Sequence, residues 1–155
     1  MKIAIASDFS GFRLKGAVRQ YLVEQGFEVA DLGQTSADTP VPYFDAAANL
    51  ARAVGAGECP KGIAICGTGA GVSMIANKHR GVYCVACESL YTAEKIGLIN
   101  NANVLAMGEK IVSPAMACEM AEAFLRAEWC KDFAPERRAN NEKGFQMLQQ
   151  IEKSN

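Results

Sequence analysis

The sequence predicts an α/β protein: a doubly wound, Rossmann-like sheet of five parallel strands, with an extra helix at the C-terminus. Short apolar runs that suit β-strands alternate with longer amphipathic stretches between residues 3 and 126. This alternation is typical of βαβ units, in which parallel strands are covered by helices on both faces of the sheet. After residue 129 the alternation stops, and a polar tail with one more amphipathic stretch follows.

The strands are expected at five short apolar runs, namely 3–7, 28–31, 62–66, 82–87 and 104–107. Helices are expected between them, because apolar residues there recur every three or four positions. The expected helices are 12–24, 43–54, 72–78, 91–98 and 114–126. Gly26 ends the first of these, and Ser113 is the N-cap of the last, with Pro114 in its first turn.

The tail, residues 131–155, has two parts. Residues 131–141 are polar and are expected to be irregular, whereas 142–153 should form a final helix with Phe145, Leu148 and Ile151 on one stripe. Periodicity alone does not decide whether this stripe packs on its own subunit or on a neighbour. The length of 155 residues is typical of one domain, so we expect a single domain over residues 1–155.

Charge and hydropathy favour a small-molecule partner. Sixteen basic and seventeen acidic residues give a net charge of −1, which predicts no surface for nucleic acid or an anionic membrane. The apolar run at residues 1–6 is too short for a signal peptide, and no run approaches membrane-spanning length. We therefore expect a cytoplasmic protein.

The six cysteines lie mostly in apolar runs and are expected to be free thiols. Cys84 and Cys87 have the spacing of a metal-binding pair. However, both fall on one expected strand, where residues three apart point to opposite faces of the sheet. No metal site is therefore expected.

The run Cys66-Gly67-Thr68-Gly69-Ala70-Gly71 is the main candidate for a ligand site. Ligands of open parallel sheets bind beyond the carboxyl ends of the strands, and this run follows the third strand. Its glycines allow a sharp turn that aims several backbone N–H groups at one anion. A dinucleotide fingerprint would need a third glycine at Val72 and would follow the first strand, so no nicotinamide cofactor is expected.

Cys66 stands at the mouth of this loop, and the sequence leaves two interpretations open. A helix N-terminus favours the thiolate, which would make Cys66 a general base. The loop amides would then stabilise the oxyanion formed when a proton leaves a carbon beside a carbonyl. This is the chemistry that moves a carbonyl between adjacent sugar carbons. The alternative is that Cys66 is simply a small buried apolar side chain.

Four other polar residues have simple structural explanations, and for three of them a functional explanation stands beside it. Asp8 either binds sugar hydroxyls or caps the helix that begins near Gly11. Arg137 and Arg138 either clamp a phosphate or form a solvated face. His79, at a helix end, is assigned no catalytic role.

The run from Cys66 to Val72, followed by Ala76-Asn77-Lys78, resembles the signature of the ribose-5-phosphate isomerase type B and galactose-6-phosphate isomerase family. The similarity covers nearly the whole chain, including Ser7-Asp8, 103–108 and the basic tail. It implies a cofactor-free enzyme built as a homodimer or dimer of dimers. Its active sites would be shared across the subunit interface, where the tail 131–155 is expected.

The resemblance also implies roles for individual residues. Cys66 would move a proton between C1 and C2 through an enediolate that the glycine loop stabilises, and Thr68 would assist at the ring oxygen. Asp8 would hold sugar hydroxyls. Another branch of the family has its base, a glutamate, at the position of Val72, which leaves Cys66 as the family-type base here. The implied substrate-binding residues are Gly67, Gly69, Gly71, Asn100, Lys110, Arg137 and Arg138.

Several positions depart from the family pattern, in which the residues at these positions are polar. The departures are Phe9 and Ile99 in place of histidines, Val41 in place of a tyrosine, and Lys110 and Asn141 in place of arginines. The proton-transfer residues are retained while ring-opening residues are lost, which indicates a substrate that is already open-chain. A tetrose 4-phosphate is such a substrate. The segments 100–102 and 137–141 resemble those of family members that act on tetrose phosphates.

Two functions therefore remain open on the sequence. The first is an aldose–ketose isomerase acting on a phosphorylated sugar, either of the ribose 5-phosphate type or a tetrose 4-phosphate. The alternative is a partner-dependent subunit of a hetero-oligomeric isomerase.

Overall fold

A parallel five-stranded sheet forms the centre of the computed structural model, which describes residues 1–154; Asn155, the last residue of the expected domain, lies outside them. The strand order is β2-β1-β3-β5-β4, and every neighbouring pair is parallel. The strands are β1 Lys2–Ser7, β2 Glu28–Asp31, β3 Lys61–Cys66, β4 Cys84–Ala86 and β5 Val104–Gly108. The chain moves outward from β1 to β2 and then returns to the other side of β1, which confirms the expected doubly wound sheet.

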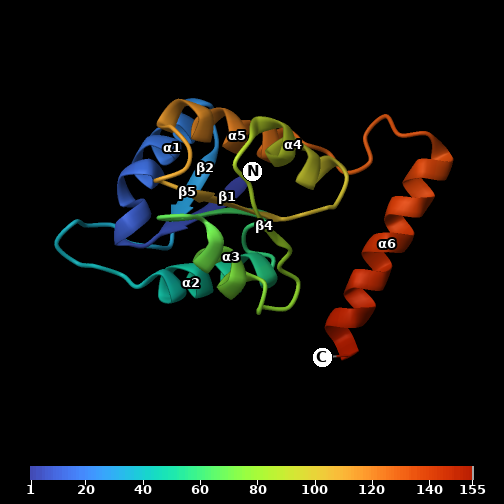
Figure 1. The fold of residues 1–155 in the computed structure, drawn as a ribbon, viewed down its shortest axis with the longest axis horizontal. Coiled ribbons are helices and arrows are strands. Elements are labelled where there is room, and N and C mark those ends of the chain that lie inside the picture. Colours follow the sequence, from blue (N-terminus) through green and yellow to red (C-terminus); the bar gives the residue numbers. More distant parts are fainter. Residues whose placement is uncertain (155) are drawn as a thin grey trace.

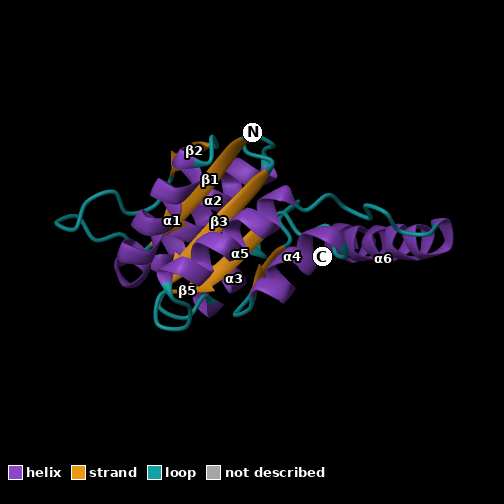
Figure 2. Ribbon diagram, turned by 90° about the horizontal axis from the view of Figure 1, so that it is seen from above, coloured by secondary structure: helices purple, strands orange, loops and turns teal. Residues whose placement is uncertain are grey.

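Helices cover both faces of this sheet (Figures 1 and 2). One face carries α1 Phe12–Glu24, α4 Leu90–Leu98 and α5 Pro114–Arg126, and the other carries α2 Tyr43–Gly55 and α3 Ala70–Ala76. A single 3-10 turn, η1 Phe9–Gly11, precedes α1. The last helix, α6 Pro135–Ser154, stands away from the sheet.

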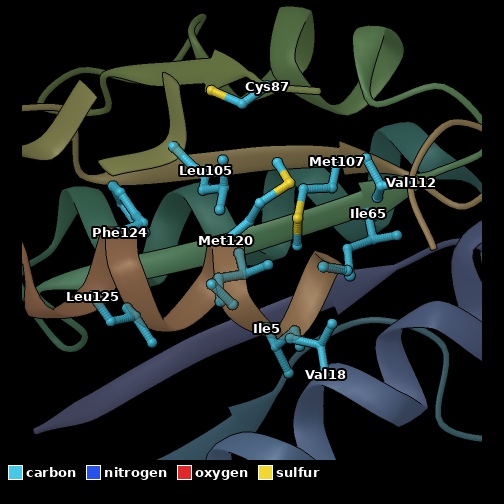
Figure 3. Packing of buried hydrophobic residues seen from close by; sticks show 14 of the residues in the cluster. Ile5, Val18, Ile65, Cys87, Leu105, Met107, Val112, Met120, Phe124 and Leu125 are labelled. Atoms are coloured by element: carbon cyan, nitrogen blue, oxygen red, sulfur yellow. The ribbon is translucent and has the colours of Figure 1, made fainter. Parts of the chain in front are cut away.

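Large and small side chains alternate along the central strands. Ile5, Ile65 and Met107 belong to the core under α1 and α5, where Figure 3 shows them close to Met120. The intervening Ala4, Ala64 and Ala106 belong to the core under α2 and α3. Small side chains let these two helices lie close to the sheet. Cys66 continues the small-residue series, so its side chain points to the α2 and α3 face.

Three expected boundaries were wrong. Helix α3 begins at Ala70, two residues earlier than expected, and β4 is shorter than 82–87. The strand ladder starts only at Cys84 because the Asn103 side chain, rather than a backbone carbonyl, accepts the N–H of Tyr83. Residues 135–141 are helical rather than irregular, since Pro135 and Glu136 suit the first turn of a helix.

Helix α6 touches the rest of the subunit at a few places. The Phe145 ring lies 5.0 Å from the ring of Tyr83 and 5.3 Å from that of Trp129. Glu152 accepts hydrogen bonds from the Gly81 backbone and from the Tyr83 hydroxyl. None of the described residues of α6 is buried. Within residues 1–154, no helix has the length and apolar character needed to cross a membrane.

Candidate functional site

Three loops meet at the carboxyl edge of the sheet, where the sequence predicts the ligand site. They follow β1, β3 and β5, and hydrogen bonds join the last two: the Glu109 N–H donates to the Cys66 carbonyl at 2.9 Å, and the Lys110 N–H donates to the Gly67 carbonyl at 3.1 Å. The Glu109 carboxylate also accepts the Leu14 N–H at 2.9 Å, which ties these loops to α1. The three loops therefore form one rigid platform.

Cys66 is the last residue of β3 and is only 6% exposed. Its Sγ accepts a hydrogen bond from the backbone N–H of Gly69 at 3.1 Å. The side chain expected to act as a base therefore already faces a donor from the glycine loop.

The glycine loop packs backbone to backbone on β5. Gly69 has a φ of +82°, and a Cβ atom placed there would lie 3.0 Å from the carbonyl carbon of Met107. A Cβ atom on Gly108 would lie 2.6 Å from the carbonyl carbon of Thr68. Helix α3 has only seven residues, so its dipole adds little and the loop N–H groups themselves make the anion-binding surface. Glycine is required here by both conformation and space.

Asp8 lies at the end of β1 and does cap the chain that follows. Its carboxylate accepts the Gly11 N–H at 3.0 Å, and the Ser10 hydroxyl donates to its oxygens at 2.8 Å. A Cβ atom on Gly67 would lie 3.4 Å from Ser10 Oγ and 3.9 Å from Lys110 Cε. Asp8, Ser10 and Lys110 thus gather around Gly67. Ser10 was missed in the sequence, although serine two residues after an aspartate is a common turn pattern.

Two further side chains border the glycine loop. Thr68 is exposed, and its hydroxyl oxygen accepts the Ala70 N–H at 3.4 Å. The ring of Tyr43, the first residue of α2, lies against Gly71. Phe9, which replaces a histidine of the family pattern, is 66% exposed. The predicted residues Asp8, Gly67, Thr68, Gly69, Gly71 and Lys110 are therefore assembled with Cys66 on one edge of the subunit.

Asn100, Arg137 and Arg138 are not part of this assembly. Asn100 lies in the connection that leads into β5, and the two arginines lie on α6. Figures 1 and 2 both show this helix beyond the opposite edge of the sheet. The Arg137 guanidinium lies 3.8 Å from the centre of the Phe133 ring, and Arg138 Nε lies 3.6 Å from a carboxylate oxygen of Glu142.

The Cys84 and Cys87 side chains lie on opposite faces of the sheet, as expected from their spacing. Burial raises the pKa of Cys84 to about 12 and that of Cys87 to about 11. Both are therefore protonated thiols at neutral pH.

Comparisons with known proteins agree with this architecture. The family model described as Ribose/Galactose Isomerase matches residues 3–142. The chain is 45% identical over 140 residues to a 4-deoxy-4-sulfo-D-erythrose isomerase of Clostridium sp. (strain MSTE9), which covers 86% of this chain and 88% of that protein. It is 35% identical to a D-erythrulose-4-phosphate isomerase of Pectobacterium atrosepticum over 83% of this chain and 85% of that protein.

A solved structure gives the same result for the fold. Ribose-5-phosphate isomerase B of Clostridium thermocellum superposes with a TM-score of 0.90 at 36% identity, over 99% of each chain. The site and the fold therefore define a Rossmann-like isomerase subunit, and the chain belongs to the ribose/galactose isomerase family. It is an enzyme, an aldose–ketose isomerase.

Proposed function

We propose that the protein interconverts an open-chain four-carbon aldose and its ketose, the sugar carrying an anionic group at C4, and that Cys66 is the base. The observation that carries this proposal is the contact between Cys66 Sγ and the Gly69 N–H at 3.1 Å, at the carboxyl edge of β3. It combines a proton acceptor with an oxyanion-stabilising loop, which are the two requirements of enediolate chemistry.

In the aldose-to-ketose direction, the Cys66 thiolate removes the proton from C2. The electron pair left on C2 forms the C1–C2 double bond, and O1 becomes the oxyanion that the loop N–H groups stabilise. The thiol then returns the proton to C1, while the O2 proton passes to O1. The Thr68 hydroxyl, exposed at the loop, is suited to this transfer between oxygens. Asp8 and Ser10 hold the remaining hydroxyls beside Gly67.

The complete site consists of residues from two subunits in a homodimer. Arg137 and Arg138 lie on α6, which Figures 1 and 2 show standing away from α3, the helix that follows the glycine loop, and Asn100 lines the groove beside α6. In a symmetric dimer they reach the loop of the partner. A groove of ≈ 820 Å³ between α6 and the body, lined in part by Leu148 and Ile151, supports a second copy as its occupant.

The open-chain substrate is inferred from two apolar residues. Phe9 and Ile99 stand where the family pattern has histidines, and neither side chain can carry a proton to or from a ring oxygen. A tetrose substituted at C4 has no free hydroxyl placed to close a furanose, so it needs no ring opening.

Of the two C4 anions named among the relatives, we favour the sulfonate over the phosphate. The relative with 45% identity acts on a 4-sulfo sugar, whereas the erythrulose-4-phosphate relatives are 35% and 34% identical. The candidate cations are also few, because Lys110 and Asn141 replace arginines of the family pattern and Arg138 pairs with Glu142. A sulfonate carries one negative charge, while a phosphate monoester carries about 1.5 to 2 at pH 7.

A substrate panel tests this proposal. We expect kcat/KM to be highest for 4-deoxy-4-sulfoerythrose, lower for erythrose 4-phosphate and lowest for ribose 5-phosphate. Between pH 5.5 and 8 the KM for the sulfonate should stay nearly constant, whereas that for the phosphate should vary as its second proton dissociates near pH 6. Failure to turn over either tetrose would refute the proposed substrate class.

A further inference from the structure

The ring of Tyr43 covers one residue of the glycine loop. A Cβ atom placed on Gly71 would lie 2.9 Å from Cε2 and 3.0 Å from Cδ2 of Tyr43. Gly71 belongs to the same loop as Cys66 and Gly69, so the ring borders the platform on which the proton transfer is proposed. Tyr43 remains 41% exposed, and its hydroxyl has no hydrogen-bond partner among residues 1–154.

The segment that delivers Tyr43 to this place is firmly held. Gln34 is fully buried: its N–H donates to the Ser7 carbonyl at 2.8 Å, and its side-chain oxygen accepts the Val41 N–H at 3.1 Å. The ammonium of Lys15, itself paired with Asp31, donates to the Gln34 carbonyl. The segment that leads to Tyr43 is therefore held before any ligand binds, and the exposed hydroxyl of Tyr43 is free to bond a ligand.

We propose that Tyr43 is a substrate-contacting residue that sets the length of sugar accepted. Its ring forms the wall of the pocket over Gly71, and its hydroxyl bonds a sugar hydroxyl. The inference rests on the proposed isomerase function. The Tyr43 ring would fit the pocket to a four-carbon sugar, because it fills the space that the fifth carbon of a longer sugar would need.

Two substitutions separate the hydroxyl from the ring. Tyr43→Phe keeps the wall and removes one neutral hydrogen bond, so kcat/KM for the tetrose should fall about threefold to tenfold, mainly through KM. Tyr43→Ala removes the wall as well. It should lower kcat/KM for the tetrose further while raising the ratio of pentose to tetrose turnover at least tenfold, the lower end of the range of about 10- to 200-fold that small changes of pocket shape produce. Tyr91→Phe, at another exposed tyrosine, is the matched control and should leave both sugars unaffected.

The readouts also distinguish this inference from the function on which it rests. Wild-type protein that exchanges no C2 proton of any tetrose or pentose substrate would overturn the proposed function. Wild-type activity with an unchanged KM in Tyr43→Phe and an unchanged pentose-to-tetrose ratio in Tyr43→Ala would overturn the role of Tyr43 alone. A loss of stability cannot imitate the expected result, because it would lower turnover of both sugars equally and leave their ratio unchanged.

Discussion

The backbone N–H of Gly69 donates a hydrogen bond to Cys66 Sγ at 3.1 Å, and Gly69 itself has a left-handed backbone conformation. Its φ of +82° turns the chain into α3, of which Gly69 is the N-cap. The same residue lies so close to Met107 that a Cβ atom would be 3.0 Å from a backbone carbon. The donor and the base are therefore held together by one glycine.

Replacing this glycine should damage both catalysis and stability, whereas a glycine with the same strain outside the site should affect stability alone. Gly69→Ala is expected to lower kcat about a hundredfold, because the added Cβ would displace the loop and its N–H groups, with an effect comparable to losing one oxyanion-type donor. Gly26→Ala is the matched control, since Gly26 has a φ of +85° and open space around its Cβ position. That variant should lose about 1–2 kcal/mol of unfolding free energy from the left-handed strain alone and keep its kcat. Urea unfolding and steady-state kinetics check both, and an active Gly69→Ala protein would contradict this account of the loop.

A shared active site predicts complementation between two defective chains. Arg137→Ala should weaken substrate binding by about 1.5–3 kcal/mol, the range for a hydrogen bond to a charged group, and Cys66→Ala should be inactive. A heterodimer of the two variants, isolated through two different affinity tags, should regain about half of the wild-type activity, because one of its two sites would be intact. If Arg137 served the site of its own subunit instead, every site of the heterodimer would be defective, and the heterodimer would not regain activity. Activity of the pure wild-type homo-oligomer would also exclude dependence on an unlike subunit.

The loss of ring-opening groups predicts slow turnover of cyclic sugars. Ile99→His should raise kcat/KM for ribose 5-phosphate while leaving the tetrose nearly unchanged, since only the pentose needs its ring opened. General acid–base assistance contributes about 100- to 10,000-fold, so even a partly oriented imidazole should give a measurable gain. Coupled assays with both sugars test this. Efficient use of ribose 5-phosphate by the unmodified protein would show that another group opens the ring.

Thiol alkylation should distinguish Cys66 from Cys84 and Cys87. The pKa of Cys84 is raised to about 12 and that of Cys87 to about 11, in both cases chiefly because burial disfavours the thiolate. At pH 8 their thiolate fractions are therefore on the order of one in a thousand or less, and both should react only as the pH approaches 11. Iodoacetamide at pH 8 should modify Cys66 in step with the loss of activity, and substrate should protect it. Inactivation without modification of Cys66, read by peptide mass spectrometry, would argue against its role.

Much of the fold could be predicted because the strands carry a simple pattern. The alternation Ile3-Ala4-Ile5-Ala6 marks a strand buried on both faces, and the runs that end at Cys66 and Met107 repeat it. The start of α6 was not predictable in the same way, because residues 135–141 have no apolar stripe to give a periodicity. Caps and first-turn preferences, rather than burial, begin this helix.

Only the part of the candidate site that is contiguous in the sequence could be predicted. The loop from Cys66 to Gly71 is contiguous and follows a strand, so its position at the sheet edge follows from topology. Ser10 and Tyr43 come from other loops, and their contacts with Gly67 and Gly71 depend on packing between elements. Sequence reasoning could not reveal that the basic tail lies far from its own glycine loop, since the direction of α6 depends on a few contacts with Tyr83 and Trp129.

Proton exchange at C2 in heavy water tests the role of Cys66 most directly, because it reports the first chemical step whether or not product is released. With a C4-substituted tetrose, the wild-type protein is expected to replace the C2 proton by deuterium, as seen by NMR. Cys66→Ala should show no exchange above the uncatalysed rate while keeping the wild-type melting temperature within a few degrees, and Cys66→Ser should be severely impaired, since a hydroxyl is a far weaker base. Near-normal exchange in the folded Cys66→Ala protein would contradict the proposed mechanism.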